Sequence, residues 1–153
     1  MHGNRLIILF CALCACIGAA EDQPPTVVVQ KLFDAMSAHD GAAARTLFIP
    51  DAMLYSIGRD GAASGLPFEK FVEHLGSSKD AWLERTWNPK VLEHGTVAVV
   101  WADYDFHLNG KFSHCGVDSF NLLKTPGGWK IASVADTRET SGCPSSPLGP
   151  PAK

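Results

Sequence analysis

The spacing of hydrophobic residues changes once along the chain, from the period of an α-helix to that of a β-strand. Residues 26–40 and 67–76 each carry apolar positions three and four residues apart, which predicts two amphipathic helices. In the first of them the apolar face consists of Val29, Leu32, Phe33 and Met36. Between the two, a short helix over residues 41–48 and a short strand over residues 52–58 are predicted.

From Ala81 onward the sequence has the pattern of extended strands. Four long strands are expected, over residues 81–92, 97–107, 112–124 and 129–139. The middle pair is joined by Asn-Gly, the dipeptide most typical of a tight hairpin. We therefore expect an α+β domain in which three helices cover a strongly bent antiparallel sheet and close it into a cone with a pocket inside.

The two ends of the chain differ in composition from this domain. Residues 1–20 combine a basic start, an apolar run and small residues before Glu21, the pattern of a secretory signal peptide. The expected division is a signal at 1–20, a domain at 21–140 and a tail rich in Pro, Ser and Gly at 141–153. Two alternatives stay open, a lipoprotein signal with Cys16 as the lipidated residue and an uncleaved anchor.

Export would place the protein in the periplasm or outside the cell, and this bears on its cysteines. Signal removal leaves Cys115 and Cys143 as the only thiols, and in an oxidising compartment they are expected to form a disulfide. The alternative is a free, buried Cys115 with Cys143 exposed.

The charge of the chain bears on whether nucleic acid is a partner. The 153 residues carry 13 Lys and Arg against 16 Asp and Glu, and no basic cluster stands out. Nucleic-acid binding needs a basic face, so no nucleic-acid partner is expected. No cofactor is implied, and no membrane span is expected once the signal is removed.

The order of the predicted elements resembles the nuclear transport factor 2-like superfamily, and within it the SnoaL-like branch. Residues 32–48 look like the family's opening helix pair, broken at Asp40, while residues 97–124 look like its central hairpin and residues 127–134 like its last strand. The resemblance covers roughly residues 26–140 and implies the cone fold. It implies no single function, because the superfamily includes dehydratases, isomerases, cyclases, epoxide hydrolases and binding proteins.

The Asn-Gly turn predicts which side chains share the concave face. A two-residue turn places Asp105 opposite His114, and alternation then assigns every other position. In the resembling family the Trp and Ile of the last strand point into the cone, which selects the His114 face as the inner one. The predicted pocket wall contains Trp101, Asp103, His114, Asp118, Phe120 and Ser133. Such a wall, largely apolar with a few polar groups, is typical of a small-molecule pocket.

Two other chemistries are disfavoured by the same alternation. Cys115 follows His114 directly and points to the opposite face, so the two do not form a catalytic pair. His114 and Asp118 share a face but lie about 13 Å apart at roughly 3.3 Å per residue, too far for one metal ion. A further alternative is that His114 lies near the exposed end of the hairpin and only solvates it.

The first long strand contains Pro89, which cannot donate a ladder hydrogen bond, so a bulge is expected there. With the bulge, Arg85 comes onto the face of Asp103 and pairs with it. Without the bulge, Glu84 would face Asp105, an unfavourable contact between like charges.

Two functions from different classes fit these observations. The first is an exported domain whose pocket binds a small, partly apolar molecule without assured catalysis, with Tyr55, Arg85, Trp101, Phe120 and Ser133 as ligand contacts. The second is a small-molecule lyase or isomerase. In it Asp103 or Asp118 takes a proton and His114 is the acid–base partner. Tyr55 or Arg85 would stabilise the developing oxyanion.

The interior of the pocket distinguishes these functions. Two or more buried carboxyls beside His114 with raised pKa would favour the enzyme, and a pocket filled by Trp101 and Phe120 would favour a domain without catalysis. We prefer the binding domain. A homodimer is also expected, through an outer sheet face made of Val100, Ala102, Tyr104, Phe106 and Val117.

Overall fold

The computed structural model describes residues 23–151, so the predicted signal and Cys16 lie outside the described residues. The described part contains three helices, α1 (Pro25–Ala38), α2 (Gly41–Arg45) and α3 (Phe68–Ser77). It also contains six strands, β1 (Phe48–Gly58), β2 (Ala63–Pro67), β3 (Trp82–His94), β4 (Val97–Leu108), β5 (Lys111–Thr125) and β6 (Gly128–Arg138). Among these residues, no helix has the length and apolar character needed to cross a membrane.

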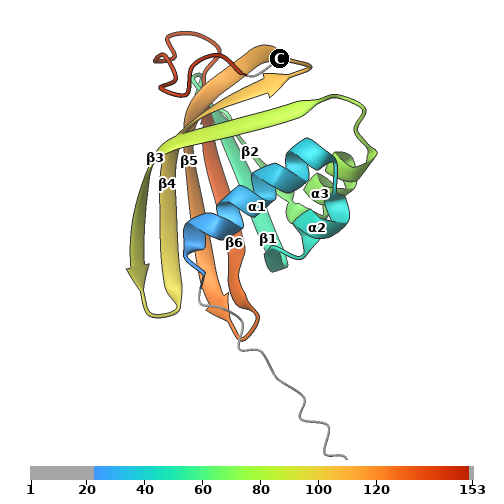
Figure 1. The fold of residues 1–153 in the computed structure, drawn as a ribbon, viewed down its shortest axis with the longest axis vertical. Helices are drawn as coiled ribbons and strands as arrows, with labels where there is room; N and C mark the ends of the chain where they lie inside the picture. Colours follow the sequence, from blue (N-terminus) through green and yellow to red (C-terminus); the bar gives the residue numbers. More distant parts are fainter. Residues whose placement is uncertain (1–22, 152–153) are drawn as a thin grey trace, which may run out of the picture.

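The six strands form one curved sheet in the order β2-β1-β6-β5-β4-β3. Only the β1–β6 pair is parallel. The helices all lie on the concave side, with α1 running across the sheet and α2 and α3 beside one end of β1 (Figure 1). The α+β prediction, with three helices over a bent sheet, is therefore confirmed.

Local sequence signals explain where the first two helices begin and end. Pro25 occupies the first turn of α1, where its missing N–H costs nothing. His39 ends the helix in the left-handed conformation, at φ 54°. The carboxylate of Asp40 then caps α2 by accepting a hydrogen bond of 2.8 Å from the Ala43 N–H.

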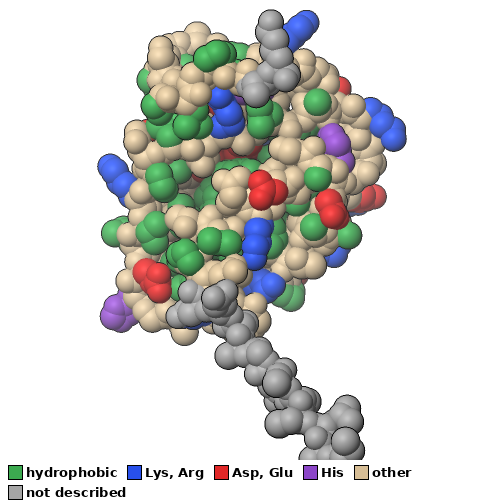
Figure 2. Space-filling model, viewed as in Figure 1, with side chains coloured by type: hydrophobic (Ala, Val, Ile, Leu, Met, Phe, Trp, Pro, Cys, Tyr) green, Lys and Arg blue, Asp and Glu red, His purple; other side chains and the backbone are tan. Residues whose placement is uncertain are grey.

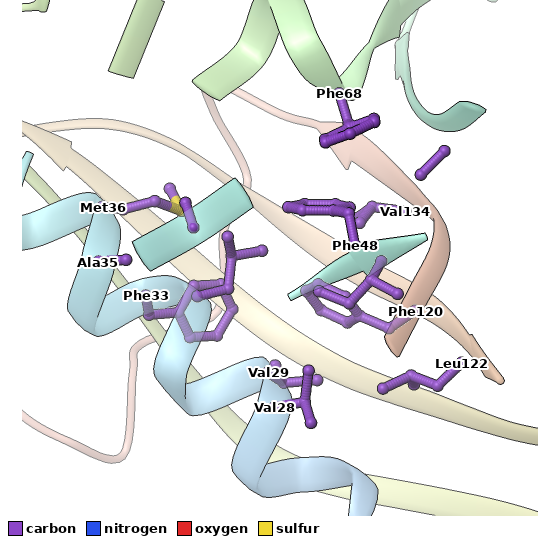
Figure 3. Packing of buried hydrophobic residues seen from close by; sticks show 14 of the residues in the cluster. Val28, Val29, Phe33, Ala35, Met36, Phe48, Phe68, Phe120, Leu122 and Val134 are labelled. Atoms are coloured by element: carbon purple, nitrogen blue, oxygen red, sulfur yellow. The ribbon is translucent and has the colours of Figure 1, made fainter. Parts of the chain in front are cut away.

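The core lies between α1 and the sheet, as the close view in Figure 3 shows. Phe33 of α1 packs edge-on against Phe120 of β5, with 5.9 Å between ring centroids. Phe48 of β1 stacks on Phe68 of α3 at 5.3 Å. This packing fills part of the space between helices and sheet, and Phe33 and Phe120 also line the cavity that remains.

Bulges in β3, β5 and β6 set which side chains of these strands face that space. The predicted bulge at Pro89 is confirmed, because the β3–β4 register shifts between Trp87 and Lys90. A second, unpredicted bulge at Ser113 in β5 pairs His114 with Phe106 and not with Asp105. The predicted faces of β5 are correct from His114 onward, whereas Phe112, before the bulge, lies on the outer face, and those of β4 are reversed. On the outer face of β4 lie Trp101, Asp103, Asp105 and His107.

The third bulge, at Ala132 in β6, was also not predicted. Leu122 pairs with Ile131, but Asn121 pairs with Ser133. Ser133 therefore points outward, where its hydroxyl is 3.0 Å from the Asn121 amide. The next residue, Val134, takes the inward position.

The edge of the sheet also differs from the prediction. Residues 63–67, where no strand was predicted, form β2 and pair with β1, which is longer than the predicted strand at residues 52–58. Turn-forming residues can enter a strand when a neighbouring backbone offers ladder hydrogen bonds. This added strand becomes one wall of the space inside the cone.

The residues predicted for a dimer face are wrong, because the reversal of β4 turns four of them inward. Val100, Ala102 and Tyr104 are each at most 2% exposed, and Phe106 lines the internal cavity. The outer face instead exposes Trp101 at 48% and Val97 at 50%. The homodimer itself stays a prediction, with Trp101 and Val97 as the side chains expected at its interface.

The predicted disulfide between Cys115 and Cys143 is present, with 6.1 Å between the two Cα atoms. It ties the tail to the outer face of β5. Arg85 Nη1 holds the tail a second time, by a 2.9 Å hydrogen bond to the Gly149 carbonyl. Together these contacts hold the C-terminal tail, drawn in dark red in Figure 1, against the sheet.

Candidate functional site

An internal cavity of about 580 Å³ lies between the helices and the concave face of the sheet. Its walls come from α1, α3 and all six strands. On the face drawn in Figure 2, hydrophobic side chains surround a hollow, and an acidic side chain is visible inside it. The cavity is therefore not filled by Trp101 and Phe120, which was the observation expected to favour a domain without catalysis.

One wall of the cavity is a row of aromatic rings. Trp82 lies 5.3 Å from His74 and 6.1 Å from Phe106, between ring centroids. Phe106 lies 5.1 Å from His114, which in turn lies 5.7 Å from Tyr104. The row crosses from α3 over β3, β4 and β5. Its rings offer a flat molecule stacking and edge contacts along its whole length.

Two carboxyl groups meet at the polar end of the cavity. Glu84 projects from β3 and Asp118 from β5, on either side of β4, and their side chains are hydrogen-bonded to each other. Burial, with the charge of Asp136, raises the pKa of Glu84 to about 7. Burial and the neighbouring Glu84 raise the pKa of Asp118 well above its ordinary value. Near neutral pH the pair therefore retains a proton.

A third carboxyl group, that of Asp136, lies directly opposite Asp118 on β6. It accepts hydrogen bonds from the Ser56 hydroxyl at 2.6 Å and the Arg138 Nε at 2.8 Å. Asp136 is thus partnered by a cation and a hydroxyl, whereas Asp118 Oδ2 has no hydrogen-bond donor among the described groups. The hydrogen bond between the two carboxyl groups favours the protonated form of Asp118, because it raises the pKa of Asp118 and Glu84 accepts.

Tyr104 closes the floor of this polar end. Its hydroxyl donates to the Thr137 carbonyl at 2.8 Å, and the Thr137 carbonyl passes directly over Gly116. A Cβ atom at Gly116 would lie 2.0 Å from that carbonyl oxygen, so only glycine permits the approach. Burial raises the pKa of Tyr104, so its hydroxyl stays protonated and acts as a donor.

His114 stands in the aromatic row, and its Nδ1 lies 2.9 Å from the Ser113 hydroxyl. Burial, and then the charge of Arg138, lowers the pKa of His114. The imidazole is therefore neutral near pH 7. A neutral imidazole can accept or donate a proton, which is what an acid–base partner requires.

The structure brings only part of the predicted site together. His114, Asp118 and Phe120 line the cavity. Asp103, a predicted proton acceptor, lies on the outer face within 3.3 Å of the Asn88 amide. Trp101 is on the same outer face. The bulge at Ser113 accounts for both corrections.

The remaining predicted ligand contacts also lie elsewhere. Tyr55 of β1 is 46% exposed and packs beside Gly65, on the opposite face from Leu54 and Ser56. Ser133 points outward because of the bulge at Ala132. Arg85 is on the outer face and pairs with Asp105, not with Asp103.

Among the polar side chains of the cavity that sequence reasoning missed are Glu84, Asp136 and Arg138. Glu84 was considered only as an unfavourable neighbour of Asp105. Its position two residues after Trp82 places both on one face of β3. That alternation was the available signal, but a charged residue facing inward is uncommon enough to be passed over.

A metal site finds no support in the described residues. No group of three or more His, Cys, Asp and Glu side chains in residues 23–151 is arranged to hold an ion. What the cavity offers chemically is hydrogen bonding and proton exchange at one end and apolar contact along the rest.

Comparison with known proteins places the chain in a family. A family model described as "putative lumazine-binding" matches residues 21–135. No curated protein matches the sequence.

Many solved structures share the fold. An NTF2-like protein of unknown function from Shewanella baltica is 20% identical, covering 76% of this chain and 91% of that one, with a TM-score of 0.58. A putative dehydratase of the NTF2-like family from Streptomyces avermitilis is 12% identical, covering 76% and 94%, with a TM-score of 0.60.

A third structure is the β subunit of a putative aromatic-ring-hydroxylating dioxygenase from Novosphingobium aromaticivorans. It is 14% identical, covers 83% of this chain and 94% of that one, and has a TM-score of 0.64. The predicted nuclear transport factor 2-like fold is thus confirmed. The SnoaL-like branch stays a prediction.

Proposed function

We propose that this chain, which belongs to the family described as "putative lumazine-binding", is an exported domain that binds a flat, partly apolar small molecule in its internal cavity. The observation that carries this proposal is the cavity itself. It has about 580 Å³ of space, an aromatic row along one wall and hydrogen-bonding groups at one end. Apolar walls with a few convergent polar groups are the usual composition of ligand sites.

The family description supports a flat ligand. Lumazine is a flat bicyclic heterocycle with N–H and C=O groups on its edge, and the aromatic row offers such a ring stacking partners. The Cys115–Cys143 disulfide supports export, because disulfides persist in oxidising compartments.

The test is to express the full chain with its own leader, purify it without denaturation and examine it by native mass spectrometry for a retained small molecule. Thermal shift assays with lumazine, naphthalene and other flat bicyclic compounds follow on the same protein. We expect at least one flat aromatic compound to raise the melting temperature in a saturable way. A folded protein that retains nothing and responds to none of them would contradict the proposal.

A second candidate function, proton transfer on a bound molecule, is favoured by one observation. Burial raises the pKa of Glu84 to about 7, which suits a group that exchanges a proton near neutral pH. In this function Glu84 or Asp118 takes the proton and the neutral His114 is its partner. Asp103, Tyr55 and Arg85 have no part in it, because they lie outside the cavity.

A further inference from the structure

The internal cavity is lined by more acidic than basic side chains. Asp80, Glu84, Asp118 and Asp136 line it, whereas Arg138 is the only Lys or Arg among the described residues that do so. Arg138 is already bound to Asp136, through a hydrogen bond of 2.8 Å from its Nε. None of the ion pairs between described residues includes Glu84 or Asp118. These two carboxyl groups therefore have no cation of their own.

Asp118 also presents an unused acceptor to the cavity. It is 2% exposed and lines the cavity, and its Oδ2 atom accepts no hydrogen bond from any described group. A buried carboxylate oxygen without a donor is costly, and a charged N–H donor compensates it better than a neutral one. A ligand that brings such a donor would therefore be favoured here.

The aromatic row passes directly beside these carboxyl groups. Glu84 of β3 pairs with Phe106 of β4, and Phe106 pairs with His114 of β5. Trp82 is two residues before Glu84 on the same face of β3 and lines the cavity with it. The faces of aromatic rings carry partial negative charge, so the row attracts a cation as well as a flat ring.

We propose that the cavity binds an organic cation, a flat aromatic molecule with a protonated amine, whose ring lies on the aromatic row and whose ammonium group binds the carboxylates of Glu84 and Asp118. This inference rests on the proposed function, because it names the charge of the ligand for the same cavity. An anionic ligand would meet further negative charge at this end of the cavity and is disfavoured.

Without such a ligand, a proton supplies the compensating charge. Burial, with the charge of Asp136, raises the pKa of Glu84 to about 7, and burial and Glu84 raise that of Asp118. Asp105 adds to the shift of Glu84 from β4. Arg138 opposes both shifts, but less than Asp136 adds to them. An ammonium group that replaces the proton should therefore bind more tightly as the pH rises from 6 to 8.

The other titratable groups that line the cavity do not supply the positive charge. Burial raises the pKa of Tyr104 and lowers that of His114, so both are uncharged in this range. His74 of α3 and Asp80 are exposed. The residues of α1 that line the cavity are apolar.

The test compares naphthalene derivatives of nearly the same shape that differ in charge. 2-(Aminomethyl)naphthalene is a cation at both pH 6 and pH 8, 2-(hydroxymethyl)naphthalene is neutral and 2-naphthoate is an anion. By isothermal titration calorimetry at pH 8, the wild-type protein should bind the amine at least about tenfold more tightly than the alcohol, and the anion most weakly. From pH 6 to pH 8 its affinity for the amine should rise by up to about tenfold, because the ionised fraction of a group with a pKa of about 7 rises by that factor. Its affinity for the alcohol should change much less.

Substitutions of the two carboxyl groups test their role. Glu84→Gln keeps the size of the side chain and removes one negative charge, so both the preference for the amine and its rise with pH should shrink. Glu84→Gln combined with Asp118→Asn should bind the amine and the alcohol alike. Asp103→Asn, which changes a carboxyl on the outer face, is the matched control and should behave as wild type. The comparison within the wild type does not depend on how any variant folds.

An amine bound no more tightly than the alcohol at pH 8, or less tightly than the anion, would overturn this inference and leave the proposed function standing. A preference for the amine that survives the double substitution in a folded protein would overturn the assignment to Glu84 and Asp118. Failure of all three compounds, and of naphthalene, to bind would overturn the proposed function itself and the inference with it.

Discussion

Asp118 of β5 and Asp136 of β6 lie directly opposite each other, and both side chains line the internal cavity. Like charges in directly opposed positions destabilise a sheet. The structure relieves this contact in two ways. Asp136 is held by Arg138 and Ser56, and Asp118 shares a hydrogen bond, and hence a proton, with Glu84.

The stability of the protein should therefore fall as the pH rises through neutrality. Burial raises the pKa of Glu84 from 4.5 to about 7, so the native state binds more protons than the unfolded state between these values. Stability from this group is then lost as pH increases, by at most about 3 kcal/mol at pH 8 relative to pH 5. Urea unfolding at both values measures the difference.

Glu84→Gln is the control for this prediction, because it removes the titrating group and keeps the size of the side chain. The variant should show a smaller loss of stability between pH 5 and pH 8 than the wild type. Identical losses in the two proteins would mean that the carboxyl pair does not hold a proton.

Much of the fold could be predicted from the sequence, because it depends on periodicity and turn chemistry. The helices, the long strands and the two-residue Asn109-Gly110 turn are as expected. The inner face of β5, with His114 and Asp118, was also assigned correctly, since it depends only on alternation within one strand.

The faces of the neighbouring strand could not be predicted, because single-residue bulges leave no signature at Ser113 or Ala132. Each bulge reverses all side chains beyond it relative to the adjacent strand. Because of these bulges, Asp103 and Ser133, which were predicted to line the cavity, lie outside it. Asp136, which was not predicted, lines it. The bulge at Pro89 could be predicted, because a proline has no N–H to donate to the ladder.

The outer face of β4 provides a matched pair of substitutions. Asp105 is 6% exposed and binds Arg85 through two hydrogen bonds, of 2.8 and 2.5 Å. Asp105→Asn should destabilise the protein by about 2–4 kcal/mol, because it leaves the Arg85 charge half-buried without its counter-ion. Asp103→Asn, two residues away with one hydrogen bond of 3.3 Å, should cost less than about 1 kcal/mol. Equal effects in chemical denaturation would contradict this assignment.

The disulfide should account for a large part of the stability of the domain. Cys115 and Cys143 are 28 positions apart, and closing a loop of that length stabilises by about 3–4 kcal/mol in the chain-entropy model. Cys143→Ser should therefore lower the free energy of unfolding by roughly that amount. Reduction of the wild type should have the same effect. Two thiols alkylated in non-reduced, exported protein would show that the bond does not form.

A homodimer through the outer sheet face should depend on Trp101. The exposed apolar side chains there include Trp101, Val97 and Leu123. Light scattering at micromolar concentration is expected to give the mass of two chains, and Trp101→Glu should give the mass of one, because a charge in an apolar interface is not compensated. A single-chain mass for the wild type would count against the dimer.

The most direct test of ligand binding in the internal cavity is to fill that cavity from its edge. Ser64 of β2 lines it, whereas the neighbouring Ala63 does not. For a flat aromatic compound that binds the wild type, titration calorimetry should show that Ser64→Trp lowers the affinity at least about tenfold, while Ala63→Trp leaves it nearly unchanged. Unchanged affinity in both folded variants would place the ligand outside the cavity and contradict the account.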